Sequence, residues 1–386
     1  MATSAWCRWL WSALTTGLVA ATGTAAAAQL DSPKLFNFVR TVQVTPHETF
    51  QTGSFARISY LPPSDRFLVT FGDKHRGPSG ECIGAGYGFM ELTLDLQPTD
   101  RAGHFLWVEG ACEANDSGAL MVGNEYYFVW VPSDQPGFYG WRVMKLDAIS
   151  WATLADASLS LTDPQERSND PTVALVNGLV DISSQYDASG IPPALDEGAA
   201  THHTVVSPVL TVEERRVLDD VPHICGASLL QAGGVTHFVT ADAFLGDLIV
   251  MKYDSAWNYL GMRHLREDAH WSTGLVFDNH RFYLAYMDTS QRAGPVDLPV
   301  YLNVRLAAFD RDWNLLEDQA VTSFTPSDHR QPGRPWLLLH GTKLYVSYDV
   351  DTVDPVTQEE QLQWQAFVSC YELSPAPRRV RGRIAP

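Results

Sequence analysis

Residues 272–288 have the sequence STGLVFDNHRFYLAYMD, in which an apolar run and an aromatic-rich run flank Asp-Asn-His-Arg. Two short β-rich runs separated by turn residues predict a hairpin of two antiparallel strands. The same arrangement recurs at residues 52–73, 116–131, 170–185, 225–242 and 333–349, where Gly, Asn or Pro-Ser-Asp joins the runs. Such recurrence along one chain predicts a fold built from repeated units.

A second signature follows the hairpins: a strand that ends in Asp, then a turn that often holds Trp. It occurs at Asp95, Asp147, Asp254 and Asp310, at intervals of 52, 107 and 56 residues. Because the middle interval is about twice the others, one degenerate copy is expected near residues 203–210. Six units of this length match the four-stranded blades of a β-propeller.

The N-terminal segment supplies a test of ring closure. Residues 37–53 align without a gap, at an offset of 221, with residues 258–274, which run from an outermost strand into the next inner strand. We therefore predict that residues 34–44 form the outer strand of the blade built mainly from 320–373, which hides the terminal sheet edges. Two β-sandwich domains would not explain this match. The predicted fold is all-β: a six-bladed β-propeller over residues 29–373, closed by the N-terminal strand.

The two ends of the chain differ in composition from the repeats. Residues 1–28 contain one positive charge (Arg8), an apolar run and a small-residue block, as in a secretory signal cleaved before Gln29. A membrane anchor is the alternative. We expect the protein to be secreted, to the extracellular space or the periplasm. Residues 374–386 hold four Arg and three Pro and are predicted to form a disordered basic tail.

Composition excludes some partners. The chain has 386 residues, of which 45% are hydrophobic, and this is enough for a large packed core. Its net charge of −18 would repel a phosphate backbone, so no nucleic-acid partner is expected. Beyond the N-terminal segment no apolar run is long enough to span a membrane, and a monomer is expected.

Four cysteines remain after the signal: Cys82, Cys112, Cys225 and Cys370. Four cysteines can pair in three ways, and no C-x-x-C spacing indicates a zinc ribbon. Cys82 falls in a predicted loop of the first unit and Cys112 at the start of the second inner strand, on one face of adjacent blades. We predict a Cys82–Cys112 disulfide. Cys225 and Cys370 are left open as disulfide-bonded or as free buried thiols.

Long segments between the second and third strands mark one face of the predicted ring. They cover residues 72–88, 185–203, 287–301 and 348–364, and long loops on a rigid scaffold are where binding usually occurs. The glycines of GAGYG (84–88) and QAGGV (231–235) lack a following helix. They are interpreted as turn residues and not as a phosphate-binding loop.

The inner strands begin on the same face with polar residues. Six of these are expected to line one mouth of the central channel: His223, His270, His329, Asp116, Asp170 and Arg330. Histidine can act as an acid, a base or a metal ligand. A divalent metal on the channel axis is therefore one candidate occupant, and a water-filled channel with hydrogen bonds between blades is the other. Trp271, Trp336 and Tyr186 are candidates for stacking on sugar rings.

One short segment carries a family resemblance. SNDPTVALVNG (168–178) is similar to the Asp-Pro hairpin in the first blade of five-bladed secreted glycosidases. The resemblance implies that Asp170 opens an inner strand as a catalytic carboxylate, and Asp116 is a further candidate. This chain departs from that family in having six units, and only Glu113 and Glu166 are candidates for the acid. The S-x-D-x-G-x-x-W boxes and arginine triad of sialidases are missing.

Two functional hypotheses follow. In the first, an exported propeller binds or hydrolyses a carbohydrate, or a related extracellular small molecule, at the mouth of its channel, with His223, His270, Trp271, His329 and Arg330 as ligand-binding residues. In the second, the loops of a non-catalytic propeller meet a protein partner. A protonatable carboxylate pair in the mouth would favour the first, and a flat apolar rim the second.

Overall fold

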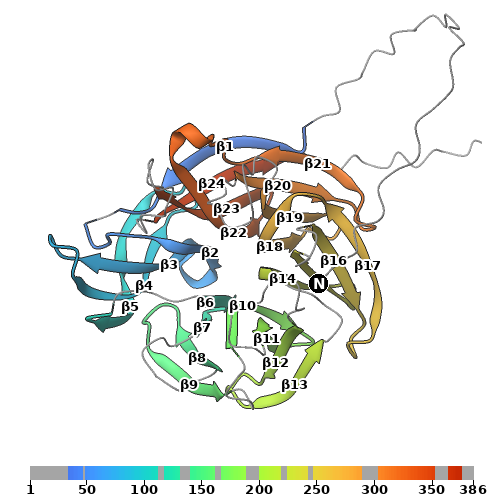
Figure 1. Ribbon diagram of the computed structural model, residues 1–386, viewed down its shortest axis with the longest axis horizontal. Coiled ribbons are helices and arrows are strands. Elements are labelled where there is room, and N and C mark those ends of the chain that lie inside the picture. The colour runs from blue at the N-terminus through green and yellow to red at the C-terminus, as the bar shows by residue number, and fades with distance from the viewer. Residues whose placement is uncertain are drawn as a thin grey trace, which may run out of the picture. The chain divides into compact units, whose positions relative to one another are not determined.

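Six antiparallel sheets of four strands each are arranged around a common centre, as Figure 1 shows. The computed structural model describes residues 34–46, 48–111, 117–130, 140–160, 167–187, 200–218, 224–241, 247–288, 303–352 and 364–375. The predicted signal segment (1–28) and most of the predicted tail (374–386) lie outside these residues. Within them, no helix is long and apolar enough to cross a membrane. The predicted six-bladed propeller is confirmed.

The first three blades follow the order of the chain from the inner strand outward. Blade 1 comprises β2 (Ser54–Leu61), β3 (Arg66–Arg76), β4 (Cys82–Leu92) and β5 (Pro98–Glu109). Blade 2 comprises β6 (Ser117–Val122), β7 (Glu125–Trp130), β8 (Gly140–Asp147) and β9 (Thr153–Ser160). Blade 3 comprises β10 (Arg167–Val176), β11 (Leu179–Asp187), β12 (Ala200–Val206) and β13 (Val212–Leu218).

The next two blades repeat this order and the last one departs from it. Blade 4 comprises β14 (Ile224–Ala232), β15 (Val235–Ala241), β16 (Leu248–Tyr253) and β17 (Tyr259–Arg266). Blade 5 comprises β18 (Ala269–Phe277), β19 (Phe282–Asp288), β20 (Asn303–Phe309) and β21 (Leu315–Ala320). Blade 6 has β22 (Arg330–His340), β23 (Lys343–Thr352), β24 (Gln365–Leu373) and, as its outer strand, β1 (Phe36–Gln43). Short 3₁₀ turns, η1 (Pro62–Ser64) and η2 (Pro326–Asp328), adjoin β3 and β22.

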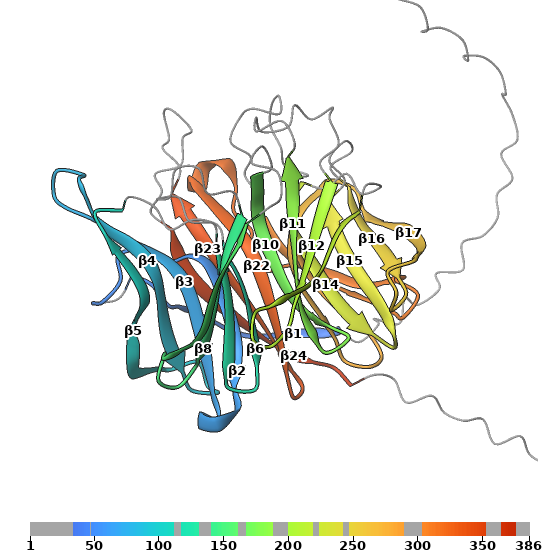
Figure 2. The ribbon, with the colours of Figure 1, turned by 90° about the horizontal axis from the view of Figure 1, so that it is seen from below.

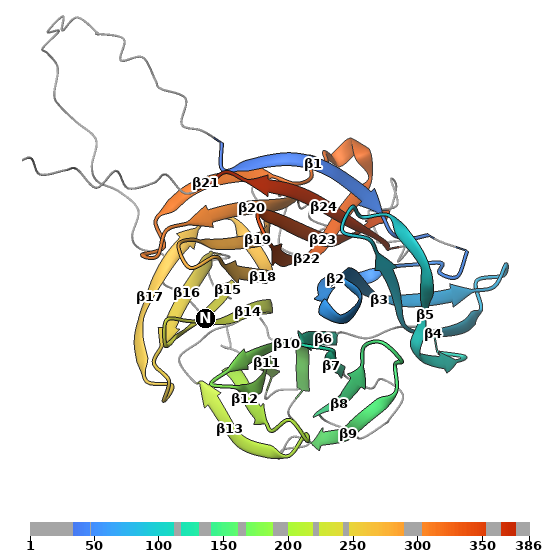
Figure 3. The ribbon, with the colours of Figure 1, turned by 180° about the vertical axis from the view of Figure 1, so that it is seen from behind.

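The ring closes through the N-terminal strand. β1 pairs antiparallel with β24, from Phe36 opposite Leu373 to Gln43 opposite Phe367. Figure 3 shows β1 lying along the outer side of β24. The predicted closure is therefore confirmed, and the two terminal sheet edges of the chain are hidden in one blade.

The core is divided among the blade interfaces. Six apolar clusters of the described residues each join two neighbouring blades, including the closing pair, where Phe67 and Val69 of blade 1 pack with Val368 of blade 6. This follows from sheets that are apolar on both faces, so that each face must be covered by a neighbour. The ring is held by packing between blades, with the inner strand of each sheet at the centre and the outer strand at the rim.

The repeated turn between third and fourth strands explains the Asp-Trp signature. In blade 4 the Trp257 N–H donates to the Asp254 carbonyl at 3.0 Å, and Trp257 has a φ of 62°. Blade 3 makes the same turn, in which the Leu210 N–H donates to the Ser207 carbonyl at 2.9 Å. The predicted degenerate copy near 203–210 is confirmed. In blade 1 the equivalent of Asp254 is Thr93 and not Asp95, because Leu96 N–H donates to the Thr93 carbonyl.

The structure tests part of the predictions for the cysteines and for the QAGGV segment. Cys370 on β24 is a free and buried thiol, and burial raises its pKa. Cys82 begins β4, whereas Cys112 lies outside the described residues, so the predicted Cys82–Cys112 disulfide stays a prediction. The QAGGV segment does form a turn, since Gly233 and Gly234 have φ values of 61° and 80° between β14 and β15.

Candidate functional site

A register shift recurs near the start of the inner strand in five of the six blades. The residues without a one-to-one partner are 55–56 in β2, 170–171 in β10, 225–227 in β14, 271–273 in β18 and 334–335 in β22. Residues 112–116, which precede β6 of blade 2, lie outside the described residues. Bulges re-aim side chains and are concentrated beside binding sites. We call this set of residues the bulge ring.

Several residues of the bulge ring are of types, or have backbone angles, that a regular strand does not accommodate. Pro171 and Pro335 cannot donate a ladder hydrogen bond, and a bulge is one of the few places where a sheet tolerates them. Phe55 and Arg334 have positive φ values of 54° and 29°. All five bulges lie near the end at which the inner strands begin, which is also the end of the second-to-third-strand connections (Figure 2).

Blades 1 and 6 contribute a contact between their two bulges. The Arg334 guanidinium lies 3.8 Å from the centre of the Phe55 ring. The Phe55 N–H donates to Asp349 Oδ2 at 2.7 Å, and a Cβ on Gly333 would lie 2.5 Å from Asp349 Oδ1. Glycine at 333 therefore admits the Asp349 carboxyl behind the bulge. Arg334 remains half-buried and presents a cation on an aromatic ring.

A carboxyl pair stands behind this contact. Asp349 and Asp351 lie two residues apart on β23 and are both fully buried. Burial raises the pKa of Asp349 to about 6, against the opposing charge of Arg334, and the charge of Asp351 adds to the increase. A carboxyl of raised pKa is what an acid catalyst needs. In the described residues, however, neither carboxyl is exposed to a substrate.

The predicted site residues fall into three groups. Asp170, His270 and Trp271 lie at the bulges of β10 and β18 or next to them, at the expected end of the inner strands, although their side chains are outside the described part. His329 has a φ of 51° between η2 and β22, and Arg330 begins β22 with its guanidinium 6.0 Å from the Phe324 ring centre. Asp116, His223, Glu113 and Glu166 lie outside the described residues. The channel-lining position of the six residues named for it stays a prediction, as do the roles of Trp271 in ligand binding and of Glu113 or Glu166 as the acid.

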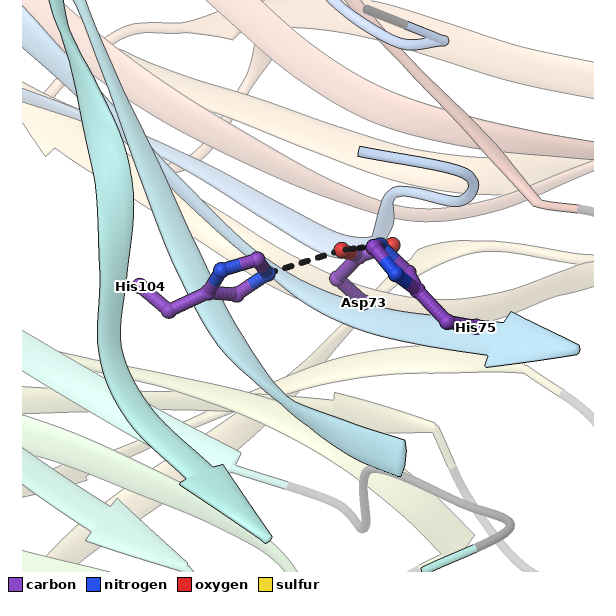
Figure 4. Close-up of side chains that lie close together, drawn as sticks. All are labelled: Asp73, His75 and His104. Atoms are coloured by element: carbon purple, nitrogen blue, oxygen red, sulfur yellow. Dashed lines mark hydrogen bonds and ion pairs between the residues drawn. The ribbon is translucent and has the colours of Figure 1, made fainter. Parts of the chain in front are cut away.

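A second cluster lies in blade 1, which the sequence interpretation missed. Residues 72–88 are not a long loop: β3 and β4 continue through them, and only residues 77–81 separate the two strands. Figure 4 shows Asp73 and His75 of β3 together with His104 of β5. The loop prediction was wrong because Gly, Lys, Arg and Pro are typical of turns, whereas here strand pairing across β4 outweighs their local preference.

Alternate glycines on β4 bring these side chains together. Gly84, Gly86 and Gly88 are opposite His75, Asp73 and Phe71 on β3. A Cβ on Gly86 would lie 2.1 Å from the Leu106 carbonyl oxygen of β5. Without side chains on this face of β4, Asp73 and His104 reach each other across the intervening strand. The GAGYG glycines are thus strand residues, and their interpretation as a turn was wrong.

Hydrogen bonds fix the Asp73 carboxylate on both oxygens. The Thr52 N–H donates to Oδ1 at 2.8 Å and the Gln51 N–H at 3.2 Å. The His75 and His104 imidazoles each donate from Nε2 to Oδ2, at 2.9 and 2.8 Å. Although burial opposes ionisation, these contacts and the neighbouring imidazoles hold the pKa of Asp73 below its ordinary value. The sequence signal was the pair of alternations D-x-H (73–75) and G-x-G-x-G (84–88), whose period of two indicates one face of a strand.

Comparison with known proteins concerns the fold of this chain and does not identify its activity. No protein-family model and no curated sequence matches the chain. The neuraminidase-like protein of subtype N10 from A/little yellow-shouldered bat/Guatemala/060/2010 has a TM-score of 0.50 and 11% identity, over 89% of this chain and 100% of that one. Exo-β-1,3-galactanases from Phanerochaete chrysosporium and Clostridium thermocellum have TM-scores of 0.47 at 14% and 15% identity.

The galactanase alignments cover 67% of this chain and only 61% and 59% of those chains. Two enzymes that act on galactans thus occur among the similar solved structures. At such identities the likeness concerns the fold.

Proposed function

We propose that this protein is an exported propeller that binds a carbohydrate at the bulge ring. The observation that supports this function best is the recurrence of a bulge at corresponding positions of five inner strands. A regular sheet has no need of such a feature in every repeat, whereas a binding site gains from side chains that are re-aimed toward one place. The five bulges carry different residue types, as a site that discriminates among ligands requires.

The chemistry of the bulge residues suits a sugar. Sugar hydroxyls need charged or amide groups as hydrogen-bond partners, and their apolar faces pack on aromatic rings. The bulges supply a carboxylate at Asp170, a cation at Arg334 and the aromatic ring of Trp271, whereas the buried Phe55 ring supports Arg334. Binding is favoured over hydrolysis because the carboxyl pair of Asp349 and Asp351 is fully buried. Hydrolysis would need Asp170 as the accessible carboxylate.

The test is a glycan screen of the intact secreted protein, followed by calorimetric titration of each glycan that binds. Asp170→Asn and Arg334→Gln should each weaken binding by about tenfold or more, since a hydrogen bond to a charged group contributes about 1.5–3 kcal/mol. Trp271→Ala should also weaken binding, because it removes the ring on which the sugar would pack. Asp312→Asn is the matched control, because Asp312 is exposed on a third-to-fourth-strand turn at the opposite end of the ring.

Three outcomes decide between the alternatives. The proposal is supported if all three bulge variants weaken glycan binding. If the wild type cleaves the glycan, and Asp170→Asn loses cleavage but still binds, the proposal extends to hydrolysis. Failure of the screen, or binding that no bulge variant affects, would contradict it. Export is checked separately by N-terminal sequencing of the secreted protein, which should begin at Gln29.

A further inference from the structure

Three metal-binding side chains of blade 1 present their ligand atoms to one point. Asp73 Oδ2 lies 2.9 Å from His75 Nε2 and 2.8 Å from His104 Nε2. The three ligand atoms all lie within 4.8 Å of one another. Two ligand atoms about 2.1 Å from one ion would be about 3.0 Å apart at about 90° and about 3.4 Å apart in tetrahedral geometry. The two carboxylate–imidazole contacts are hydrogen bonds, and each would lengthen by about 0.1–0.6 Å to admit an ion.

The surroundings hold each ligand in place. Thr52 and Gln51 donate to Oδ1 of Asp73, which leaves Oδ2 directed at the imidazoles. The Trp107 ring centre lies 4.9 Å from that of His75 and 4.6 Å from that of His104. Hydrogen bonds on the far side of a ligating carboxylate and apolar packing around ligating rings are common features of protein metal sites.

The cluster is open on one side. Asp73 is fully buried, whereas the side chains of His75 and His104 are 25% and 19% exposed. An ion bound between them would be reached from solvent and would keep at least one position for water or another ligand. This differs from a closed structural site, in which four protein ligands surround the metal.

We propose that Asp73 Oδ2, His75 Nε2 and His104 Nε2 bind a divalent first-row transition-metal ion, for which Zn²⁺ is the probe. Two imidazoles and one carboxylate form a ligand set typical of such ions. In the metal-free state each imidazole carries its proton on Nε2 and donates it to Asp73. On binding, the imidazole loses the Nε2 proton to solvent and takes up a proton on Nδ1, so that it stays neutral and the Nε2 lone pair coordinates the ion. This site uses none of the bulge-ring residues and does not depend on the proposed carbohydrate.

The alternative is a hydrogen-bonded cluster that only ties β5 to β3. Substitution of the histidines by glutamine distinguishes the metal site from the hydrogen-bonded cluster. The glutamine amide can still donate a hydrogen bond to Asp73, but it is a poor ligand for transition metals. We therefore compare His75→Gln and His104→Gln with the wild type, and use His280→Ala, an exposed histidine in the β18–β19 turn, as the matched control.

Protein freed of metal by a chelator is titrated with Zn²⁺ in a calorimeter, with thermal unfolding as a check of the fold. We expect one Zn²⁺ per chain in the wild type and His280→Ala, and affinity weakened more than about 100-fold in both glutamine variants. Zn²⁺ should also raise the unfolding temperature of the wild type and leave that of His104→Gln unchanged.

A folded wild type that binds no Zn²⁺, or a His104→Gln variant that binds it as tightly as the wild type, would overturn the proposal. If a glutamine variant fails to fold, X-ray absorption at the zinc edge of the wild type decides the question. Two imidazole ligands and oxygen donors support the site, whereas sulfur ligands or a single imidazole contradict it.

Discussion

Asp73 and Asp349 are both fully buried on the second strands of neighbouring blades, yet their pKa values are shifted in opposite directions. Asp73 accepts hydrogen bonds on both oxygens, and its pKa is lowered. Asp349 accepts the Phe55 N–H on Oδ2, while Oδ1 has no hydrogen-bond partner among the described residues, and its pKa is raised to about 6. Burial raises the pKa of both carboxyls; the hydrogen-bond donors and imidazoles around Asp73 outweigh this effect, whereas the groups around Asp349 do not.

The functional consequence differs accordingly. A carboxylate that stays ionised can pair with a cation, which is the role that we propose for Asp73. A carboxyl whose pKa is raised to about 6 carries a proton below that pH, and Asp349 then lies beside Asp351 without the full repulsion of two charges. The four predictions below test this contrast, beginning with the largest expected effect.

Asp73→Ala should lower the free energy of unfolding by about 3 kcal/mol, because it leaves the Thr52 and Gln51 N–H groups and two imidazoles without their common acceptor. Urea unfolding at pH 7 measures the effect. Asp100→Ala, an exposed position on β5, is the control and should change stability by less than about 0.5 kcal/mol. Equal losses in the two variants would contradict the central role of Asp73.

The second prediction concerns the pH dependence of stability. Because the folded pKa of Asp349 is about 6 and exceeds its unfolded value, the folded state binds more protons between about pH 4 and pH 6. The stabilisation is complete below the unfolded pKa and is lost as pH rises through 6. It amounts to about 2–3 kcal/mol. Unfolding free energies of the wild type and Asp349→Asn between pH 4 and 8 should converge at the acidic end and favour the variant at pH 8.

Asp73 supplies the internal contrast to this measurement. Its lowered pKa means that its contribution is present above the unfolded pKa and is lost as pH falls through the folded one. Asp349→Asn should leave that acidic loss intact. If the variant kept the full decline toward pH 8, the pKa of Asp349 would not be the cause.

The third prediction tests the glycine row that assembles the Asp73 cluster. Gly86→Ala should lower the free energy of unfolding by about 2 kcal/mol, because the new Cβ would lie 2.1 Å from the Leu106 carbonyl oxygen and force β4 and β5 apart. Gly103→Ala on β5 is the matched control, since its Cβ would meet only the Phe89 ring, at 3.5 Å. Thermal unfolding compares the two, and equal effects would show that the row is not required.

The fold could be predicted from the sequence, whereas the Asp73 cluster, on which several of these predictions depend, could not. Blade number, the six hairpins, the degenerate turn at 207–210 and the closing β1 strand were predictable, because repeats and hydrophobic alternation lie along the chain. The Asp73 cluster was not, because His104 joins it across β4 from a distant position and the flanking Gly, Lys and Pro resemble a loop. Recurrent bulges leave no signature in hydrophobic alternation, which is why the inner-strand starts were predicted from polarity alone.

The smallest expected effect separates the two causes of the raised Asp349 pKa. Burial is the larger cause and the charge of Asp351 a lesser one, so Asp351→Asn should lower the pKa of Asp349 by less than about one unit. The free energy of unfolding would still decline between pH 4 and 8, but the midpoint of this decline would move to lower pH. Loss of the decline in Asp351→Asn would mean that the two carboxyls titrate as one coupled pair. In that case charge repulsion, and not the shortage of donors around Asp349, would be what distinguishes it from Asp73.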